Sequence, residues 1–232
     1  MNIWLIPALL LTFIPPTIYV IWIRNTEKYN KEKWKTIFIC FLWGATIAII
    51  ASIILELILK TSISISINDK NTIGIISVVI IAPIVEELTK PIIIGMKIIK
   101  TELDELEDGF IYGAAAGLGF SATENFLYGV SIMSFGFLAF IILLIIRSSG
   151  ACLLHASATA FSSYGYCQKK IKNKSILSVV PFFIFAIIIH SAYNFVLTFD
   201  QIGAFFGLII SLLIASLSIF YIRKKIIKLD RK

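Results

Sequence analysis

Long apolar stretches alternate with short polar segments along the whole chain. Each apolar stretch has about 20 residues or more, the length that an α-helix needs to cross a hydrocarbon core of about 30 Å. The predicted spans are residues 3–23, 36–59, 73–96, 109–130, 137–166, 176–198 and 203–222. The connecting segments are too short for a soluble domain. The pattern therefore predicts an all-α, polytopic membrane helix bundle of about seven transmembrane helices, with residues 1–232 as one domain.

The composition agrees with this class, because 58% of the residues are hydrophobic. The net charge is +7, and the basic residues are unevenly distributed. Seventeen of the 21 lie in residues 24–35, 97–100, 169–174 and 223–232, and the opposite loops hold only two. Since Lys and Arg accumulate on the cytoplasmic side, we predict an outside N-terminus and a cytoplasmic C-terminus. The positive charge would face the headgroups of the lipid bilayer, and we expect no nucleic-acid partner.

Three charged residues interrupt the third apolar stretch. The segment Ala82–Pro91 reads Ala-Pro-Ile-Val-Glu-Glu-Leu-Thr-Lys-Pro, which sets Glu86, Glu87 and Lys90 in an apolar run. A charge at the centre of a membrane helix costs at least about 2.5–3.5 kcal/mol, so it usually marks a functional site. Glu86 and Glu87 are about 100° apart around a helix. One carboxylate can thus face a reacting group while Lys90 compensates the other.

Charged, histidine and asparagine side chains also occur in the later spans. They are Glu124, Asn125, Arg147, His155, His190 and Asn194. At 1.5 Å per residue, Glu86, Glu124 and both histidines lie about 15–24 Å from the predicted cytoplasmic ends of their helices. Four groups from four helices at one depth predict a converging site.

An alternative interpretation assigns these residues to helix association only. Glu86 or Glu87 would pair with Lys90, and Glu124 would pair with Arg147. The polar side chains would then hold the bundle together without doing chemistry.

Two prolines predict freed backbone groups in the membrane. Pro83 and Pro91 have no N–H, which leaves the carbonyls of Val79 and Glu87 without their usual helical donors. Such groups need another partner away from water, so they suit a cavity that contains water.

The fourth span contains closely spaced small residues. Gly113 and Gly117 are one helical turn apart, with three alanines between them. This small-xxx-small pattern predicts close helix contact, which would bring Glu124 towards its neighbours.

Taken in chain order, these residues form a recognisable set of motifs. The set comprises Glu86-Glu87-Leu88-Thr89-Lys90, Asp108-Gly109, Tyr112-Gly113, Gly117-Leu118-Gly119-Phe120-Ser121-Ala122-Thr123-Glu124-Asn125, Arg147 with His155, and His190 with Asn194. It resembles the PrsW family of intramembrane proteases, from Ala82 to Asn194. That family is distantly similar to the CAAX prenyl endopeptidase and bacteriocin-immunity group. The latter has Arg one position beyond the place of Lys90, so the PrsW family is the better match.

The resemblance implies a multi-pass protease of a bacterial or archaeal cell membrane. Such a protease makes the first cut in a single-pass membrane protein, with anti-sigma factors as the known substrate class. Amide hydrolysis without a Ser or Cys nucleophile needs an activated water, and Glu86 or Glu87 can serve as its general base. By analogy with the CAAX group, His155 positions the water, and His190 with Asn194 stabilises the oxyanion. The supporting residues are Lys90, Asp108, Glu124, Asn125 and Arg147.

A metal-dependent route is the alternative to this chemistry. The family is often described as a metalloprotease, and zinc could be held by Glu86, Glu87, Glu124, His155 and His190. However, the chain lacks the HExxH spacing of known zinc proteases. We therefore expect no cofactor, with zinc as the alternative.

Two other classes of function would use a similar set of residues. An ion- or proton-coupled carrier also buries acids, histidines and a lysine near the midplane. A non-catalytic immunity or scaffold protein could use the same helices to bind a partner. The block from Gly117 to Asn125 favours the protease over the carrier.

Overall fold

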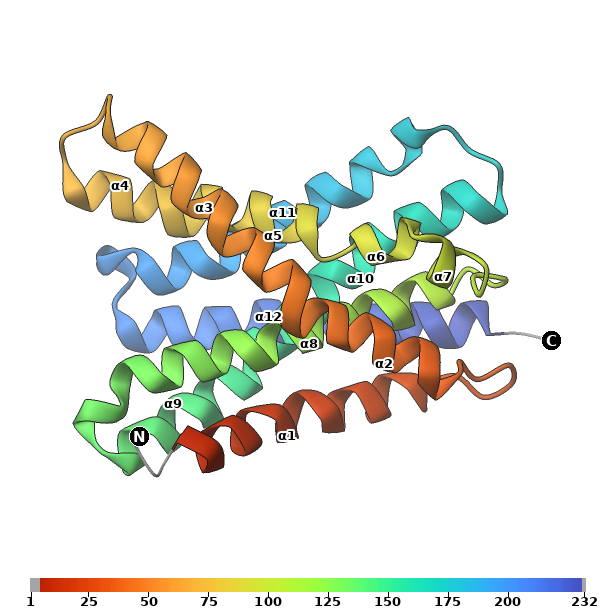
Figure 1. Cartoon of the computed structure of the whole chain (residues 1–232), viewed down its shortest axis with the longest axis horizontal. Helices are drawn as coiled ribbons and strands as arrows, with labels where there is room; N and C mark the ends of the chain where they lie inside the picture. The colour runs from red at the N-terminus through yellow and green to blue at the C-terminus, as the bar shows by residue number, and fades with distance from the viewer. Residues whose placement is uncertain (1–4, 231–232) are drawn as a thin grey trace.

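The structure, a computed structural model, describes residues 5–230 (Figure 1). Every regular element in this range is helical, as the sequence predicts. The main helices are α1 (Leu5–Arg24), α2 (Trp34–Trp43), α3 (Ile49–Ser64), α4 (Lys70–Ile76), α5 (Ala82–Thr89), α8 (Asp108–Ile132), α9 (Phe137–Ser149), α10 (Ala151–Ile171), α11 (Val180–Thr198) and α12 (Ala204–Leu229). Shorter elements are η1 (Gly44–Ala48), η2 (Ser77–Ile81), α6 (Ile92–Gly95), α7 (Lys97–Lys100), η3 (Met133–Phe135), η4 (Ile176–Ser178) and η5 (Asp200–Ile202).

Six helical segments of the described chain are long and apolar enough to cross a membrane. They are Leu5–Arg24, Trp34–Ser64, Lys70–Gly95, Phe137–Ile171, Ile176–Thr198 and Ala204–Leu229. Each overlaps one of the predicted spans. Large apolar side chains on these helices, such as Leu57, Leu138 and Leu217, are more than 60% exposed, as expected for a surface that faces lipid.

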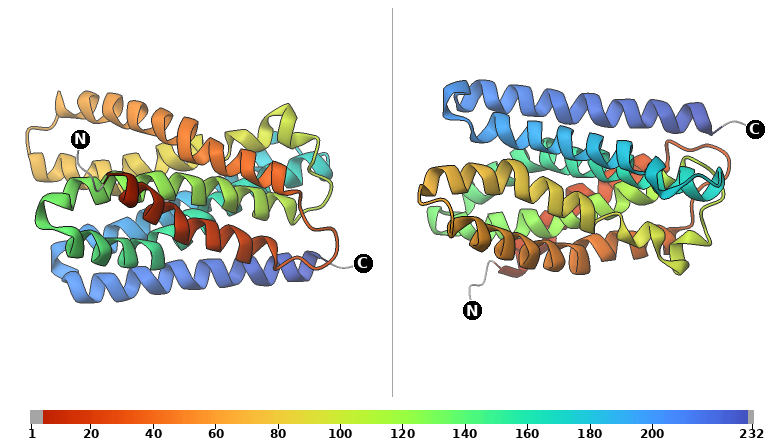
Figure 2. Two further views of the ribbon diagram at one scale, coloured as in Figure 1. Left: turned by 60° about the horizontal axis from the view of Figure 1, so that its bottom comes forward. Right: turned by 90° about the horizontal axis from the view of Figure 1, so that it is seen from above.

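The remaining predicted span, residues 109–130, forms α8 at the centre of the bundle. Its residues from Asp108 to Ala122 are all buried, and it packs against α10, α1 and α2 (Figure 2). This helix is rich in Gly and Ala, so it is less apolar than the other six segments. Because protein rather than lipid surrounds α8, small residues that permit close packing replace large apolar ones.

Two predicted spans differ from the structure in detail. The stretch expected at 137–166 is divided into α9 and α10 by a break at Gly150, and α10 continues to Ile171. The third span is interrupted by the π-helical turn η2, and helix α5 ends at Thr89, just before Pro91. Since Pro91 cannot donate to a carbonyl of the preceding turn, the helix stops there.

Candidate active site

The helix that carries the glutamate pair begins directly after the π-helical turn η2. In this turn each backbone N–H donates to the carbonyl five residues earlier. By that spacing the Val78 carbonyl would accept from residue 83, but Pro83 has no N–H. Asn194 of α11 replaces it, because its Nδ2 donates to the Val78 carbonyl at 2.9 Å. Asn194 thus supplies a side-chain donor at the turn that precedes Pro83. That the carbonyls of Val79 and Glu87 lack their helical donors stays a prediction.

Lys90 lies at the centre of the charged residues and is fully buried. Its Nζ is 2.6 Å from Glu87 Oε1, 3.1 Å from Glu86 Oε2 and 3.0 Å from His155 Nδ1. The ammonium also lies 4.6 Å from the centre of the Phe120 ring. The three hydrogens of Lys90 thus each have a polar partner, so the lysine neutralises and orients its neighbours.

The two adjacent glutamates differ in how many partners they have. Both oxygens of Glu87 are occupied: Oε1 by Lys90 and by His190 Nδ1 at 2.9 Å, and Oε2 by the Thr159 hydroxyl at 3.1 Å. Glu86 accepts a hydrogen bond at Oε2 only, from Lys90. Glu86 borders the cavity described below, whereas Glu87 does not.

A second charged group extends from His155 into α8 and α9. His155 Nε2 lies 2.9 Å from Glu124 Oε2, and Arg147 Nη2 lies 2.7 Å from the same oxygen. Arg147 Nε also donates to Asn125 Oδ1 at 2.6 Å, and its guanidinium stacks on the Tyr128 ring. The pairs of the alternative interpretation, Lys90 with the glutamates and Arg147 with Glu124, therefore exist, but His155 joins them into one network.

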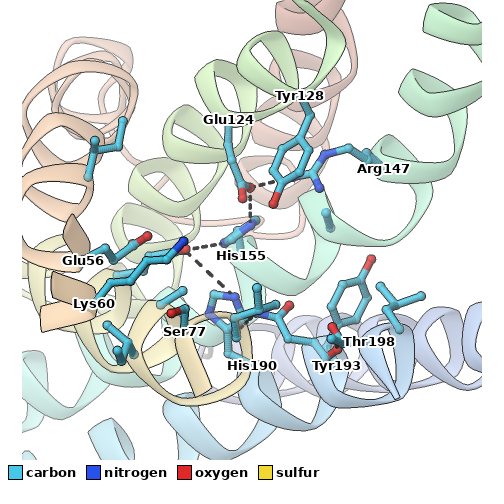
Figure 3. A pocket seen from close by; sticks show the side chains of 18 of the residues that line it. Glu56, Lys60, Ser77, Glu124, Tyr128, Arg147, His155, His190, Tyr193 and Thr198 are labelled. Carbon is cyan, nitrogen blue, oxygen red and sulfur yellow. Dashed lines mark hydrogen bonds and ion pairs between the residues drawn. The ribbon is translucent and has the colours of Figure 1, made fainter. Parts of the chain in front are cut away.

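A cavity of about 590 Å³ opens beside this network (Figure 3). Its polar lining includes Glu86, Glu124, His155, His190 and Asn194. In Figure 3, Glu124, His155 and Arg147 come from one side of the cavity, and His190 faces them from α11. The structure thus brings the polar residues of five helices together at one cavity, of the size typical of ligand sites.

Six polar residues that line the cavity were not predicted from the sequence, namely Glu56, Lys60, Ser77, Tyr128, Tyr193 and Thr198. Glu56 lies within the predicted span 36–59, so the cost of an intramembrane charge should have marked it in the same way as Glu86. Tyrosines occur so often at membrane interfaces that Tyr128 and Tyr193 carried no comparable signal.

Comparison with known proteins adds an independent result. Residues 32–222 match the family model described as PrsW family intramembrane metalloprotease. The chain belongs to the PrsW family. It is also 26% identical to Protease PrsW of Clostridioides difficile (strain 630) over 208 residues, which cover 88% of this chain and 85% of the relative. No solved structure gives a significant match.

Membership of the PrsW family confirms two of the predictions. The chain is an intramembrane protease, and it is a multi-pass protein of the cell membrane. The carrier and the non-catalytic scaffold are therefore set aside.

The family description also raises the question of a metal, and three residues of this PrsW protein fit one. Glu86, His155 and His190 each offer one ligand atom, and these atoms lie within 4.8 Å of one another. Glu86 Oε2 is 3.6 Å from His155 Nδ1 and 3.9 Å from His190 Nε2. Two imidazoles and a carboxylate are a known ligand set of catalytic zinc, whose bonds of about 2.0–2.1 Å require slightly shorter separations. Glu87 and Glu124, also predicted as ligands, are not in this group.

One predicted supporting residue lies far from the cavity. Asp108 is the first residue of α8, sixteen positions before Glu124, or about 24 Å along the helix. The sequence motifs could not reveal this distance, because they include residues that stabilise the fold as well as residues of the active site. Asp108 belongs to a separate cluster at one end of the bundle.

Proposed function

We propose that this PrsW protease hydrolyses a peptide bond in or near the transmembrane segment of a single-pass membrane protein, with Glu86 activating the water. The main support is that Glu86 is the glutamate of the pair that borders the cavity and keeps one oxygen without a hydrogen-bond partner. An anti-sigma factor is the proposed substrate, by resemblance to the family.

The lining of the cavity supports a hydrophobic peptide as the substrate. Apolar residues of three helices border it, including Leu57, Val78 and Leu197. These side chains are 64%, 40% and 47% exposed, on helices that face lipid. A transmembrane segment could therefore reach the polar end of the cavity from the side without leaving an apolar environment.

In the proposed reaction, Glu86 removes a proton from a water molecule in the cavity. The water oxygen bonds to the carbonyl carbon of the substrate, and the proton then passes to the amide nitrogen as the C–N bond breaks. Glu87 does not act on the substrate in this scheme. It holds His190 and Lys90, and Lys90 in turn donates to Glu86.

The hydrogen-bond partners of the histidines restrict what each ring can do. His190 Nδ1 donates to Glu87, so the neutral ring has no hydrogen on Nε2, which lies near Glu86. His190 is thus suited to accept a hydrogen from the water, whereas we had expected it to donate to the oxyanion. Asn194 has a second amide hydrogen beyond the one used by Val78, and we propose this N–H as the oxyanion donor.

A divalent metal held by Glu86, His155 and His190 would supply Lewis acidity to the substrate carbonyl and lower the pKa of a bound water. Glu86 would then be a ligand. The choice between these two roles of Glu86 is open to experiment.

The test compares Glu86→Gln, Glu87→Gln and the control Glu102→Gln in purified, lipid-reconstituted protein with a single-pass reporter substrate. Glu102 lies outside the cavity, in the loop before α8. We expect Glu86→Gln to lower turnover by about 100-fold or more with an unchanged melting temperature. Glu87→Gln should lower turnover and stability together, because it releases Lys90 and His190. Full activity of Glu86→Gln would refute the proposal.

Metal content of the same preparations decides the role of Glu86. One zinc per chain, removed by a chelator with loss of activity and restored on re-addition, would make Glu86 a ligand. Activity that persists after prolonged chelation would make Glu86 the general base.

A further inference from the structure

Three buried carboxylates form a second cluster at the end of the bundle where α1 ends and α2 and α8 begin. Glu27 and Asp108 are fully buried, and Glu32 is 6% exposed. Each offers one oxygen, and the three oxygens lie within 4.8 Å of one another. The proposed reaction uses none of these residues.

The protein orients each of these carboxylates through one oxygen. Glu27 Oε2 accepts the backbone N–H of Glu32 at 3.0 Å, and Glu32 Oε2 accepts the Tyr112 hydroxyl. Asp108 Oδ2 accepts two backbone N–H groups of the preceding loop, at 2.7 and 2.8 Å. The other oxygens of Glu27 and Asp108 are buried and have no hydrogen-bond partner. Two oriented acceptors are therefore left unsatisfied.

No basic side chain among residues 5–230 forms an ion pair with these three carboxylates. The nearby cations have other partners: Arg24 Nε donates to the Glu32 carbonyl, and Lys33 pairs with Glu102. Burial, followed by repulsion from Asp108, raises the pKa of Glu32 to about 10. Without a cation the cluster therefore holds a proton on Glu32, and a positive partner would take the place of that proton.

We propose that Glu27, Glu32 and Asp108 bind a hard divalent cation, Ca²⁺ or Mg²⁺. All the donor atoms are oxygens, which these ions prefer and which do not select zinc. Two ligands on opposite sides of a Ca²⁺ ion are separated by about 5 Å, so the observed oxygens can share one ion. Bound there, the cation joins the α1–α2 loop to the first turn of α8, the helix that carries Glu124.

Cation binding is measured directly, without proteolysis, on full-length protein freed of metal with a chelator. Electron paramagnetic resonance with Mn²⁺ as the probe should detect one tight site per chain, from which Ca²⁺ or Mg²⁺ displaces the Mn²⁺. The effective competitor identifies the preferred ion. In thermal unfolding, a hundredfold excess of that ion over Kd should raise the melting temperature by about 5–10 °C.

The variant Glu27→Gln/Asp108→Asn should lose this Mn²⁺ site and the response to cations. It should still fold, and without cation it should be more stable than the wild type because it buries fewer unpaired charges. The matched control Asp104→Asn changes an exposed acid of the same loop and should retain the site. Glu86→Gln should also retain it, which separates this inference from the proposed function.

Two results would overturn the proposal. One is Mn²⁺ binding that survives Glu27→Gln/Asp108→Asn. The other is the absence of a Mn²⁺ site in the wild-type protein.

Discussion

At the scale of single residues, the charge balance of the cavity depends on Lys90. It contacts both glutamates of α5 and one histidine, and none of its surface is exposed. Lys90 pairs with Glu87, and Arg147 pairs with Glu124. Glu86 is the carboxyl of the network that has no cation of its own, which suits a proton acceptor or a metal ligand.

Replacing Lys90 by methionine tests this balance. The variant Lys90→Met leaves two buried carboxylates without their cation, so we expect a loss of about 3–5 kcal/mol in the free energy of unfolding. Lys60→Met is the control, because Lys60 is exposed and forms no ion pair among the described residues. Denaturant unfolding in detergent measures both. A partial recovery in Lys90→Met/Glu87→Gln would show that the orphaned carboxylate causes the loss, and equal stability of the two lysine variants would contradict the argument.

Two roles are open to Asn194. Its side-chain amide donates to the Val78 carbonyl, and the same side chain borders the cavity. If the second N–H stabilises the oxyanion, Asn194→Ala should lower kcat by about 100- to 1,000-fold with little change in KM. If the residue only supports the π-helical turn, the variant should lose about 1–3 kcal/mol of stability and keep most of its kcat. Steady-state kinetics and thermal unfolding of the same preparation distinguish the two.

At the scale of the elements, the contact between α8 and α10 positions the site. Gly117 of α8 lies against the backbone of His155, and an added Cβ there would overlap the His155 carbonyl. The absence of a side chain at Gly117 therefore allows the close approach in which Glu124 reaches the His155 ring. The small residues of α8 thus position the site by allowing the backbones of α8 and α10 to lie close together.

The variant Gly117→Ala should force α8 and α10 apart. We expect a destabilisation of about 1–3 kcal/mol, together with reduced turnover as Glu124 moves away from His155. Gly74→Ala is the matched control, since Gly74 is also helical and nothing lies within 4 Å of its added Cβ. That variant should be neutral or gain up to about 1 kcal/mol. Unfolding and cleavage assays on both glycine variants check the expectation, which equal effects would contradict.

At the scale of the whole molecule, the loops at the two ends of the bundle differ in charge. Figure 1 shows the α1–α2, α7–α8 and α10–α11 connections and the end of α12 at one end of the bundle, and the α3–α4 connection at the other. The basic-rich segments of the sequence thus gather at one end. Which end faces the cytoplasm stays a prediction from the charge bias.

Cysteine labelling tests this orientation. The three natural cysteines, Cys40, Cys152 and Cys167, are buried and would be replaced by alanine for a clean background. A cysteine introduced at Asn68 should react with a membrane-impermeant thiol reagent in intact cells, and one at Lys172 only after permeabilisation. Both positions are exposed. The reverse pattern of labelling would invert the predicted topology.

The sequence by itself determined the helical class and pointed to most residues of the candidate site. Apolar stretches of membrane length must satisfy their backbone hydrogen bonds internally, so they predict helices. The cost of intramembrane charge then selected Glu86, Lys90, His155 and His190, which the structure brings together.

Only the tertiary structure decided how these helices are rotated and which residues meet. The sequence left Glu86 and Glu87 equivalent, because the face that a helix turns towards a cavity depends on packing by its neighbours. The π-helical turn and the hydrogen bond from Asn194 to the Val78 carbonyl also depend on how α11 packs against this helix, so the sequence could not show them. Asp108 lies at the far end of α8 beside Glu27 and Glu32, since proximity between distant segments arises from packing and is not encoded in motif spacing.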